Sequence, residues 1–130
     1  MEFGSVHLNR RFRSPFLSQV DLTALKNLDL KELADCAEEA SSFLRALGNS
    51  HRLMILCVLA RGEASVGEIQ EALALRQSLV SQHLTRLKAD ELVIARRSQQ
   101  FMLYSIKTDA VREVIATVCK HFVDDKESWD

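Results

Sequence analysis

The stretch Gln77–Lys88 and the residues that follow it constrain the fold of this chain more than any other part. Val80, Leu84 and Leu87 stand at i, i+4 and i+7, which places them on one apolar stripe of a helix. The opposite face carries Ser, Gln, Thr and basic residues, with no acidic residue before Asp90. Such side chains can hydrogen-bond base edges and phosphates. The stretch alone fits either a DNA-reading helix or an ordinary amphipathic helix that is rich in amides.

The next residues favour the first interpretation. Two β-prone runs, Leu92–Arg97 and Phe101–Ile106, flank the polar turn Ser98–Gln100 and predict a two-stranded hairpin with a basic, amide-rich tip. A reading helix followed directly by such a hairpin is typical of a winged helix-turn-helix. In that fold the helix enters the major groove and the hairpin lies on the adjacent DNA backbone.

We therefore expect a double-stranded DNA operator as the partner. Hydroxyl and amide side chains of the helix would read bases, and basic side chains would hold phosphates. His83 flanks the apolar stripe and is expected to pack or to contact phosphate. The expected DNA-binding residues are Gln77, Ser78, Ser81, Gln82, His83, Thr85, Arg86, Lys88, Arg96, Arg97, Gln99 and Gln100.

Charge is segregated along the chain, although the formal net charge is only −1. Five basic and two acidic residues stand between Arg76 and Arg97, a local charge of +3. From Asp124 onward, four acidic residues stand against one lysine, a local charge of −3. A positive segment that coincides with the expected DNA face is the distribution that DNA binding requires.

Two core helices are expected before the reading unit. Helical periodicity predicts the first over about Leu33–Leu47, with Cys36 on its buried stripe. The second, about His51–Ala60, is apolar almost all round and should be buried, with Asn49 or Ser50 as its cap.

Two further helices complete the expected domain. The run Ser65–Glu68 has capping-box spacing and opens a helix that reaches about Ala74. The last helix begins near Asp109, and its apolar stripe finds no obvious partner inside so small a domain. This stripe is expected to form a dimer seam, with packing inside the subunit as the alternative. It comprises Val111, Val114, Ile115, Val118 and Phe122.

The 130 residues fit one domain, expected over 29–123, with an acidic tail at 124–130. Residues 1–28 are interpreted as an N-terminal extension. In it, 1–5 read as a cloning scar, the basic segment 6–14 as a disordered stretch or a phosphate-contacting arm, and Asp21 as the cap of a short helix.

Composition narrows the functional classes. No apolar run approaches the length of a membrane span and no secretory signal is present, so a cytoplasmic setting is expected. Three widely spaced cysteines do not form a secreted disulfide framework. No catalytic motif is present, so neither an enzyme nor a cofactor is expected.

Several motifs, taken in order, resemble the ArsR/SmtB repressors over about Leu33–Phe122. The resemblance implies a mostly α fold with a small β-hairpin wing, in the order α/α/α/α/β/β/α. It also implies a homodimer through the first and last core helices that binds an imperfect palindrome. The motifs are Leu44–Leu56, Ser65–Ile69, Ser81–Leu84, Leu92–Val93, Arg96–Arg97 and Leu103–Ile106.

The resemblance also bears on metal binding. Metal-sensing relatives carry a Cys-x-Cys pair where this chain has Ser65 and Gly67. The zinc site on the last helix of other relatives would keep Asp109 alone, because Val111 and Phe122 occupy the expected histidine positions. We therefore expect no metal site of either kind.

The cysteines look more like those of the sulfur- and redox-responsive branch. Cys57 occupies the position of a sensing cysteine, whereas the second family cysteine aligns with Val123, four residues beyond Cys119. A four-residue shift keeps a similar helix face. We therefore predict that Cys57 and Cys119 sense a persulfide, polysulfide or oxidant, with small buried apolar residues as the alternative for each.

Two other functions stay open at this stage. Cys36, Cys57 and Cys119 together could bind arsenite or another thiophilic ion, and winged helices also serve as protein-interaction modules. The sequence departs from the family at Glu91 and Gln99, where glycines are usual, which leaves the shape of the wing turns open.

Overall fold

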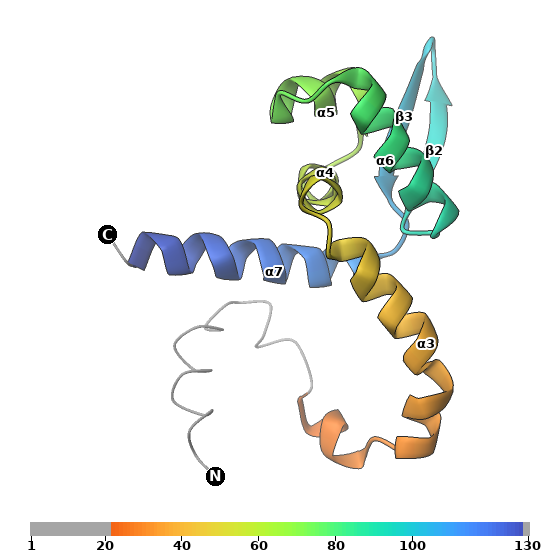
Figure 1. The fold of residues 1–130 in the computed structure, drawn as a ribbon, viewed down its shortest axis with the longest axis vertical. Coiled ribbons are helices and arrows are strands. Elements are labelled where there is room, and N and C mark those ends of the chain that lie inside the picture. The colour runs from red at the N-terminus through yellow and green to blue at the C-terminus, as the bar shows by residue number, and fades with distance from the viewer. Residues whose placement is uncertain (1–21, 129–130) are drawn as a thin grey trace.

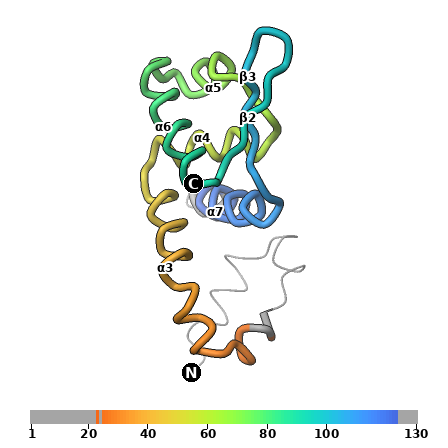
Figure 2. The backbone as a smooth tube through the Cα atoms, turned by 90° about the vertical axis from the view of Figure 1, so that its right-hand side faces the viewer, coloured from red at the N-terminus to blue at the C-terminus, as the bar shows by residue number. Residues whose placement is uncertain are grey.

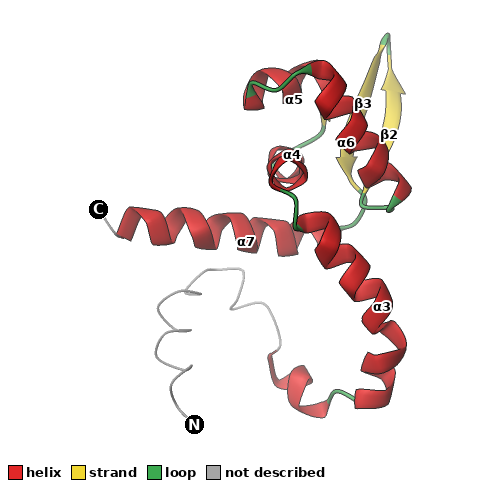
Figure 3. Ribbon diagram, in the orientation of Figure 1, coloured by secondary structure: helices red, strands yellow, loops and turns green. Residues whose placement is uncertain are grey.

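The computed structural model describes residues 22–128 (Figure 1). The expected cap Asp21 and the segments 1–5 and 6–14 lie outside the described residues. The fold is mostly helical with one small sheet, as predicted (Figure 3). Its elements are η1 (Leu22–Asn27), α3 (Leu30–Leu47), α4 (Ser50–Ala60), β1 (Ala64–Ser65), α5 (Val66–Leu73), α6 (Gln77–Ala89), β2 (Val93–Ser98), β3 (Phe101–Ile106) and α7 (Asp109–Ser128).

Helix α4 lies at the centre of the core, which confirms its expected burial. Ile55, Leu56 and Leu59 have no exposed surface, and the helix contacts α3, α5, α6, α7 and β3. Asn49 caps it by accepting a hydrogen bond from the Arg52 backbone N–H at 3.0 Å. Asn49, and not Ser50, is therefore the cap.

Helices α5 and α6 form the helix-turn-helix that packs on α4. Ser65 and Glu68 make the predicted capping box at the start of α5, with hydrogen bonds of 3.0 and 3.1 Å. The reading helix, which the sequence predicts over Gln77–Ala89, is present with those bounds as α6, and its stripe of Val80, Leu84 and Leu87 is fully buried. Burial of this stripe leaves the polar face of α6 directed outward.

The wing belongs to a three-stranded antiparallel sheet with the order β1-β3-β2. The predicted hairpin is present, with Val93 opposite Ile106 and Ser98 opposite Phe101. The sequence did not predict β1, whose two residues add a third strand beside β3. This strand ties the base of the wing to the start of α5.

Both wing turns keep the left-handed backbone that glycine usually supplies. Glu91 has φ 62° and Gln99 has φ 55°, and Gln99 lies in a two-residue turn between β2 and β3. Amino acids with a Cβ adopt this region at a cost of about 1 kcal/mol or more. The two departures from the family pattern therefore change residue types without lengthening the hairpin turn.

Helix α3 departs from expectation. Its N-terminal part lies at the opposite end of the molecule from the wing tip, in both views (Figures 1 and 2). Ala46 is the buried residue of this helix, whereas Leu33 is 41% and Leu44 61% exposed. The expectation that Cys36 is buried is wrong for one protomer, because this part of α3 extends beyond the core and Cys36 is exposed.

Helix α7 divides its apolar stripe between two surroundings. Ile115 is fully buried, while Val114 is 39% and Phe122 66% exposed. The helix continues to Ser128 and so includes part of the acidic segment 124–130. The inner part of the stripe packs on α4, and the outer part stays uncovered in one protomer.

No single helix within residues 22–128 is long and apolar enough to span a membrane. Helices α3 and α4 reach the length and hydropathy of a membrane span only when they are taken together, and they are bent by 92° relative to each other.

Leu56→Ala tests the central place of α4. Removal of a fully buried leucine should lower the free energy of unfolding by about 2–5 kcal/mol, because it leaves a cavity in a packed core. Met54→Ala is the matched control on the same helix, where the side chain is 38% exposed and the loss should be much smaller. Urea unfolding measures both, and equal losses would contradict this core.

Candidate DNA interface and cysteine pair

The polar face of α6 is the first candidate surface. Ser81 and His83 are half-buried, and the remaining predicted contacts on this helix are exposed. The Thr85 hydroxyl donates to the Ser81 carbonyl at 2.9 Å, which holds it against its own helix. The exposed members are Gln77, Ser78, Gln82, Thr85, Arg86 and Lys88.

The four expected phosphate-binding cations differ in their surroundings. Arg86 donates at 3.1 Å to Asp90, the residue that caps the end of α6. Lys88 and Arg97 are exposed and form no ion pair within the part of the chain that the structure describes. They are therefore the freer of the expected cations to approach phosphate.

Arg96 of the wing forms a two-pronged ion pair with Glu63. Its Nε and Nη2 atoms donate to the two carboxylate oxygens of Glu63 at 2.9 and 2.6 Å. The hydrogen bond from Arg96 holds the pKa of the Glu63 carboxyl below its usual value, and Glu63 raises the pKa of Arg96. A two-pronged pair of this kind fixes orientation, so Arg96 ties strand β2 to the segment before β1.

Two histidines and Arg52 lie close together between α4 and α6. The rings of His51 and His83 are 5.6 Å apart between centroids. Arg52 donates from Nε to the Ala46 carbonyl at 2.9 Å, which joins α4 to the end of α3. Burial lowers the pKa of His83 from its usual 6.5, and the positive charge of Arg52 and the neighbouring His51 lower it further.

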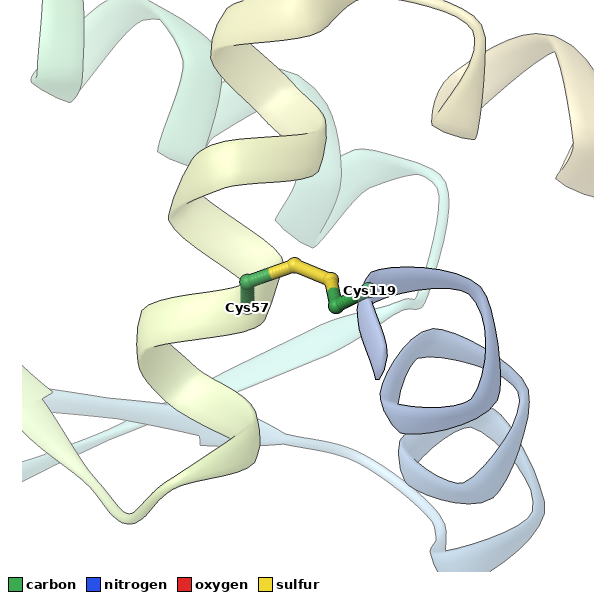
Figure 4. The surroundings of a disulfide bond; sticks show 2 residues. All are labelled: Cys57 and Cys119. Atoms are coloured by element: carbon green, nitrogen blue, oxygen red, sulfur yellow. A yellow bond between two sulfur atoms is a disulfide. The ribbon is translucent and has the colours of Figure 1, made fainter. Parts of the chain in front are cut away.

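The cysteine pair is the second candidate site. A disulfide joins Cys57 of α4 to Cys119 of α7, with 6.7 Å between the Cα atoms (Figure 4). Both residues are half-buried and pack against the core. The Cys119 position therefore reaches Cys57 although it lies one helical turn before Val123. The bond links the helix beneath α6 to the helix that carries the uncovered apolar stripe.

A pocket of about 410 Å³ opens beside this disulfide. Its walls come from α4 and α7, and both cysteines lie on its surface. The wall residues are Cys57, Ala60, Arg61, Ala116, Cys119, Lys120 and Val123.

Sequence reasoning named residues of both candidate surfaces but missed several of their neighbours. Glu63 lies 33 residues from its partner Arg96, and no local pattern joins them. Arg61 and Lys120 gave no signal either, because an isolated cation on an amphipathic helix usually marks a solvated face. The capping role of Arg52 likewise appears only in three dimensions.

The fold and these surfaces define a winged helix-turn-helix protein. The sequence profile of the family described as "Bacterial regulatory protein, arsR family" matches residues 49–95. HTH-type transcriptional regulator YgaV of Escherichia coli is 40% identical over 91 residues, which cover 69% of this chain and 92% of that protein. The chain therefore belongs to the ArsR/SmtB family of transcriptional regulators.

Solved structures agree with this assignment. Reduced HlyU from Vibrio cholerae has 37% identity and a TM-score of 0.65, with 69% of this chain and 95% of that chain covered. A homodimeric winged helix-turn-helix DNA-binding domain from Mycobacterium bovis has 33% identity and a TM-score of 0.62, with 72% and 85% covered. The matching family and YgaV are described as regulatory proteins, which is the class that the sequence predicts for this chain.

The His83 cluster predicts acid sensitivity of the fold. Because the folded pKa of His83 is lowered from 6.5, the unfolded chain takes up this proton more readily once the pH falls below 6.5. Stability that is present above pH 6.5 is therefore lost as the pH falls toward the lowered value.

Urea midpoints at about pH 7.5 and 5.5 measure this loss. His83→Gln should lose less stability between the two values than the wild-type protein. A His83→Gln protein as acid-sensitive as the wild type would exclude His83 as a source.

Proposed function

We propose that this regulator is a homodimeric repressor that leaves its operator when Cys57 and Cys119 are oxidised or modified by reactive sulfur. The observation that carries the proposal is the covalent link between α4 and α7. Helix α4 packs beneath α6, so a bond to α7 joins the proposed reading unit to the proposed dimer seam. That one similar protein was solved in a form described as reduced supports a role for redox state.

Operator recognition would use the outward face of α6 and the wing. Exposed amides and hydroxyls on α6 would read base edges in the major groove. Lys88 and Arg97 would hold phosphates, because neither is engaged in an ion pair among the described residues. Arg96 would contribute mainly by orienting the wing through Glu63.

Dimerisation would cover the apolar side chains that one protomer leaves exposed on α3 and α7. These two helices supply the dimer in the family that the sequence resembles, and the similar domain from Mycobacterium bovis is described as homodimeric. The recognition helices of a dimer must match half-sites about 34–36 Å apart. The side chains concerned are Leu30, Leu33, Leu44, Val114 and Phe122.

The proposed switch requires only a modest free-energy difference between the DNA-binding and the released state. Oxidation of two thiols to the disulfide passes two electrons and two protons to the oxidant; with a persulfide, the outer sulfur leaves as sulfide. A hundredfold loss of operator affinity corresponds to about 2.7 kcal/mol. A covalent link that tilts α4 relative to α7 need supply only this difference between two arrangements of the dimer.

The two alternative functions receive less support. Among the described residues, which include all three cysteines, no group of three or more His, Cys, Asp or Glu side chains could hold a metal ion. Cys36, Cys57 and Cys119 of one protomer do not form such a group. The relatives are described as regulatory proteins, which supports the repressor and gives no support to a protein-interaction module.

Salt dependence distinguishes the proposed cations from one another. The operator is first selected from random DNA duplexes. The affinity of the protein for this operator is then measured by fluorescence anisotropy at several salt concentrations. Arg97→Gln and Lys88→Gln should each reduce the slope of log affinity against log salt by about 1, because each removes one phosphate contact.

Arg96→Gln is the matched wing variant. It should change the slope less than Arg97→Gln, since its guanidinium already pairs with Glu63. Equal changes in slope for Arg96→Gln and Arg97→Gln would show that the Glu63 pair opens on DNA.

Cysteine variants test the switch. Cys57→Ser and Cys119→Ser should bind operator as the untreated wild type does, but they should not dissociate after polysulfide treatment. Cys36→Ser should respond normally, because this exposed thiol lies outside the pair. Reductant should restore binding of the wild type. Dissociation of treated Cys57→Ser from DNA would refute the proposed switch.

A further inference from the structure

The pocket beside the disulfide has the composition of a ligand site. Five of its wall residues are apolar or sulfur-bearing, and both cysteines of the disulfide are among them. Its volume of about 410 Å³ lies within the range of small-molecule sites. A molecule in this pocket would therefore lie against the sulfur atoms.

Two cations complete the wall. Arg61 follows the end of α4, and Lys120 lies on α7 next to Cys119. Both are exposed, and neither takes part in an ion pair within residues 22–128. Two free positive charges beside an apolar, sulfur-lined wall favour a ligand that carries a negative charge and an apolar stem.

We propose that this pocket recognises low-molecular-weight thiols that carry a carboxylate, and that these thiols reduce the Cys57–Cys119 disulfide. Arg61 and Lys120 would bind the carboxylate and act as specificity-determining residues. The apolar wall of Ala60, Ala116 and Val123 would contact the carbon stem of the thiol. The proposal rests on the disulfide and its pocket, so it stands separately from operator release.

The exchange proceeds in two steps. The thiolate of the small molecule attacks one sulfur, the Cys57–Cys119 bond breaks, and the other cysteine leaves as a thiolate that takes up a proton. A second thiolate then attacks the small-molecule sulfur of the mixed disulfide and releases the remaining cysteine. Two small thiols lose two electrons and form one disulfide, and the two protein sulfurs become thiols.

Charge selection can be isolated with a matched pair of reagents. N-acetylcysteine carries a carboxylate, and N-acetylcysteine amide has nearly the same size without it. Reduction rates are measured by intact mass after acid quenching and alkylation, and are expressed per thiolate, because the thiolate is the nucleophile. The ratio of the two rates, N-acetylcysteine over N-acetylcysteine amide, is then divided by the same ratio measured with 2-hydroxyethyl disulfide as the substrate. This division removes the difference in intrinsic reactivity between the two thiols.

The corrected ratio for the wild-type protein should be about three- to tenfold, the range expected from two partly exposed charge pairs. It should approach one in the double variant Arg61→Gln/Lys120→Gln, and in the wild type at high salt. Lys31→Gln, which removes a lysine of α3 outside the pocket wall, should retain the wild-type ratio.

A wild-type ratio near one, or a ratio unchanged in the double variant, would overturn carboxylate recognition. A ratio that falls equally in Lys31→Gln would assign the preference to net charge and would also overturn the pocket. Circular dichroism of each variant confirms that it is folded. No DNA is present in these measurements, so their outcome is independent of whether the disulfide controls operator binding.

Discussion

Burial of α4 is the constraint on which the rest of the structure depends. Ile55, Leu56 and Leu59 have no exposed surface, whereas Met54 on the same helix is 38% exposed, so packing fixes the inward side of the helix. It contacts the reading unit through α5 and α6, the wing through β3, and the helices with uncovered apolar surface, α3 and α7. Close-packed interiors transmit small displacements and do not absorb them. A change at one face of α4 is therefore felt at the others.

The disulfide acts at one of these faces. Cys57 lies on α4 itself, and Cys119 lies on α7 near the residues that one protomer leaves exposed. In the proposed function, bond formation selects one of two arrangements of α4 and α7, and the spacing of two recognition helices reports the choice. The adjacent pocket would then decide which small thiols reset the arrangement, through Arg61 and Lys120.

Features encoded over short distances were predictable from sequence. The bounds of α6, the capping box of Ser65 and Glu68, and the wing hairpin follow from local periodicity and capping. Long-range features were not. The Glu63–Arg96 pair and the strand β1 depend on the meeting of segments far apart in the chain, and the exposure of Cys36 depends on what packs against α3. The DNA contacts and the sensing role of the thiols remain predictions.

The central claim is that the cysteine state and operator binding are thermodynamically linked, and linkage is reciprocal. The reduction potential of the Cys57–Cys119 pair, measured in thiol buffers with and without saturating operator, tests it most directly. If the reduced form binds DNA about a hundredfold more tightly, operator should raise the potential by about 60 mV, because tenfold corresponds to about 30 mV for two electrons. An unchanged potential would show that the disulfide and the DNA face are uncoupled.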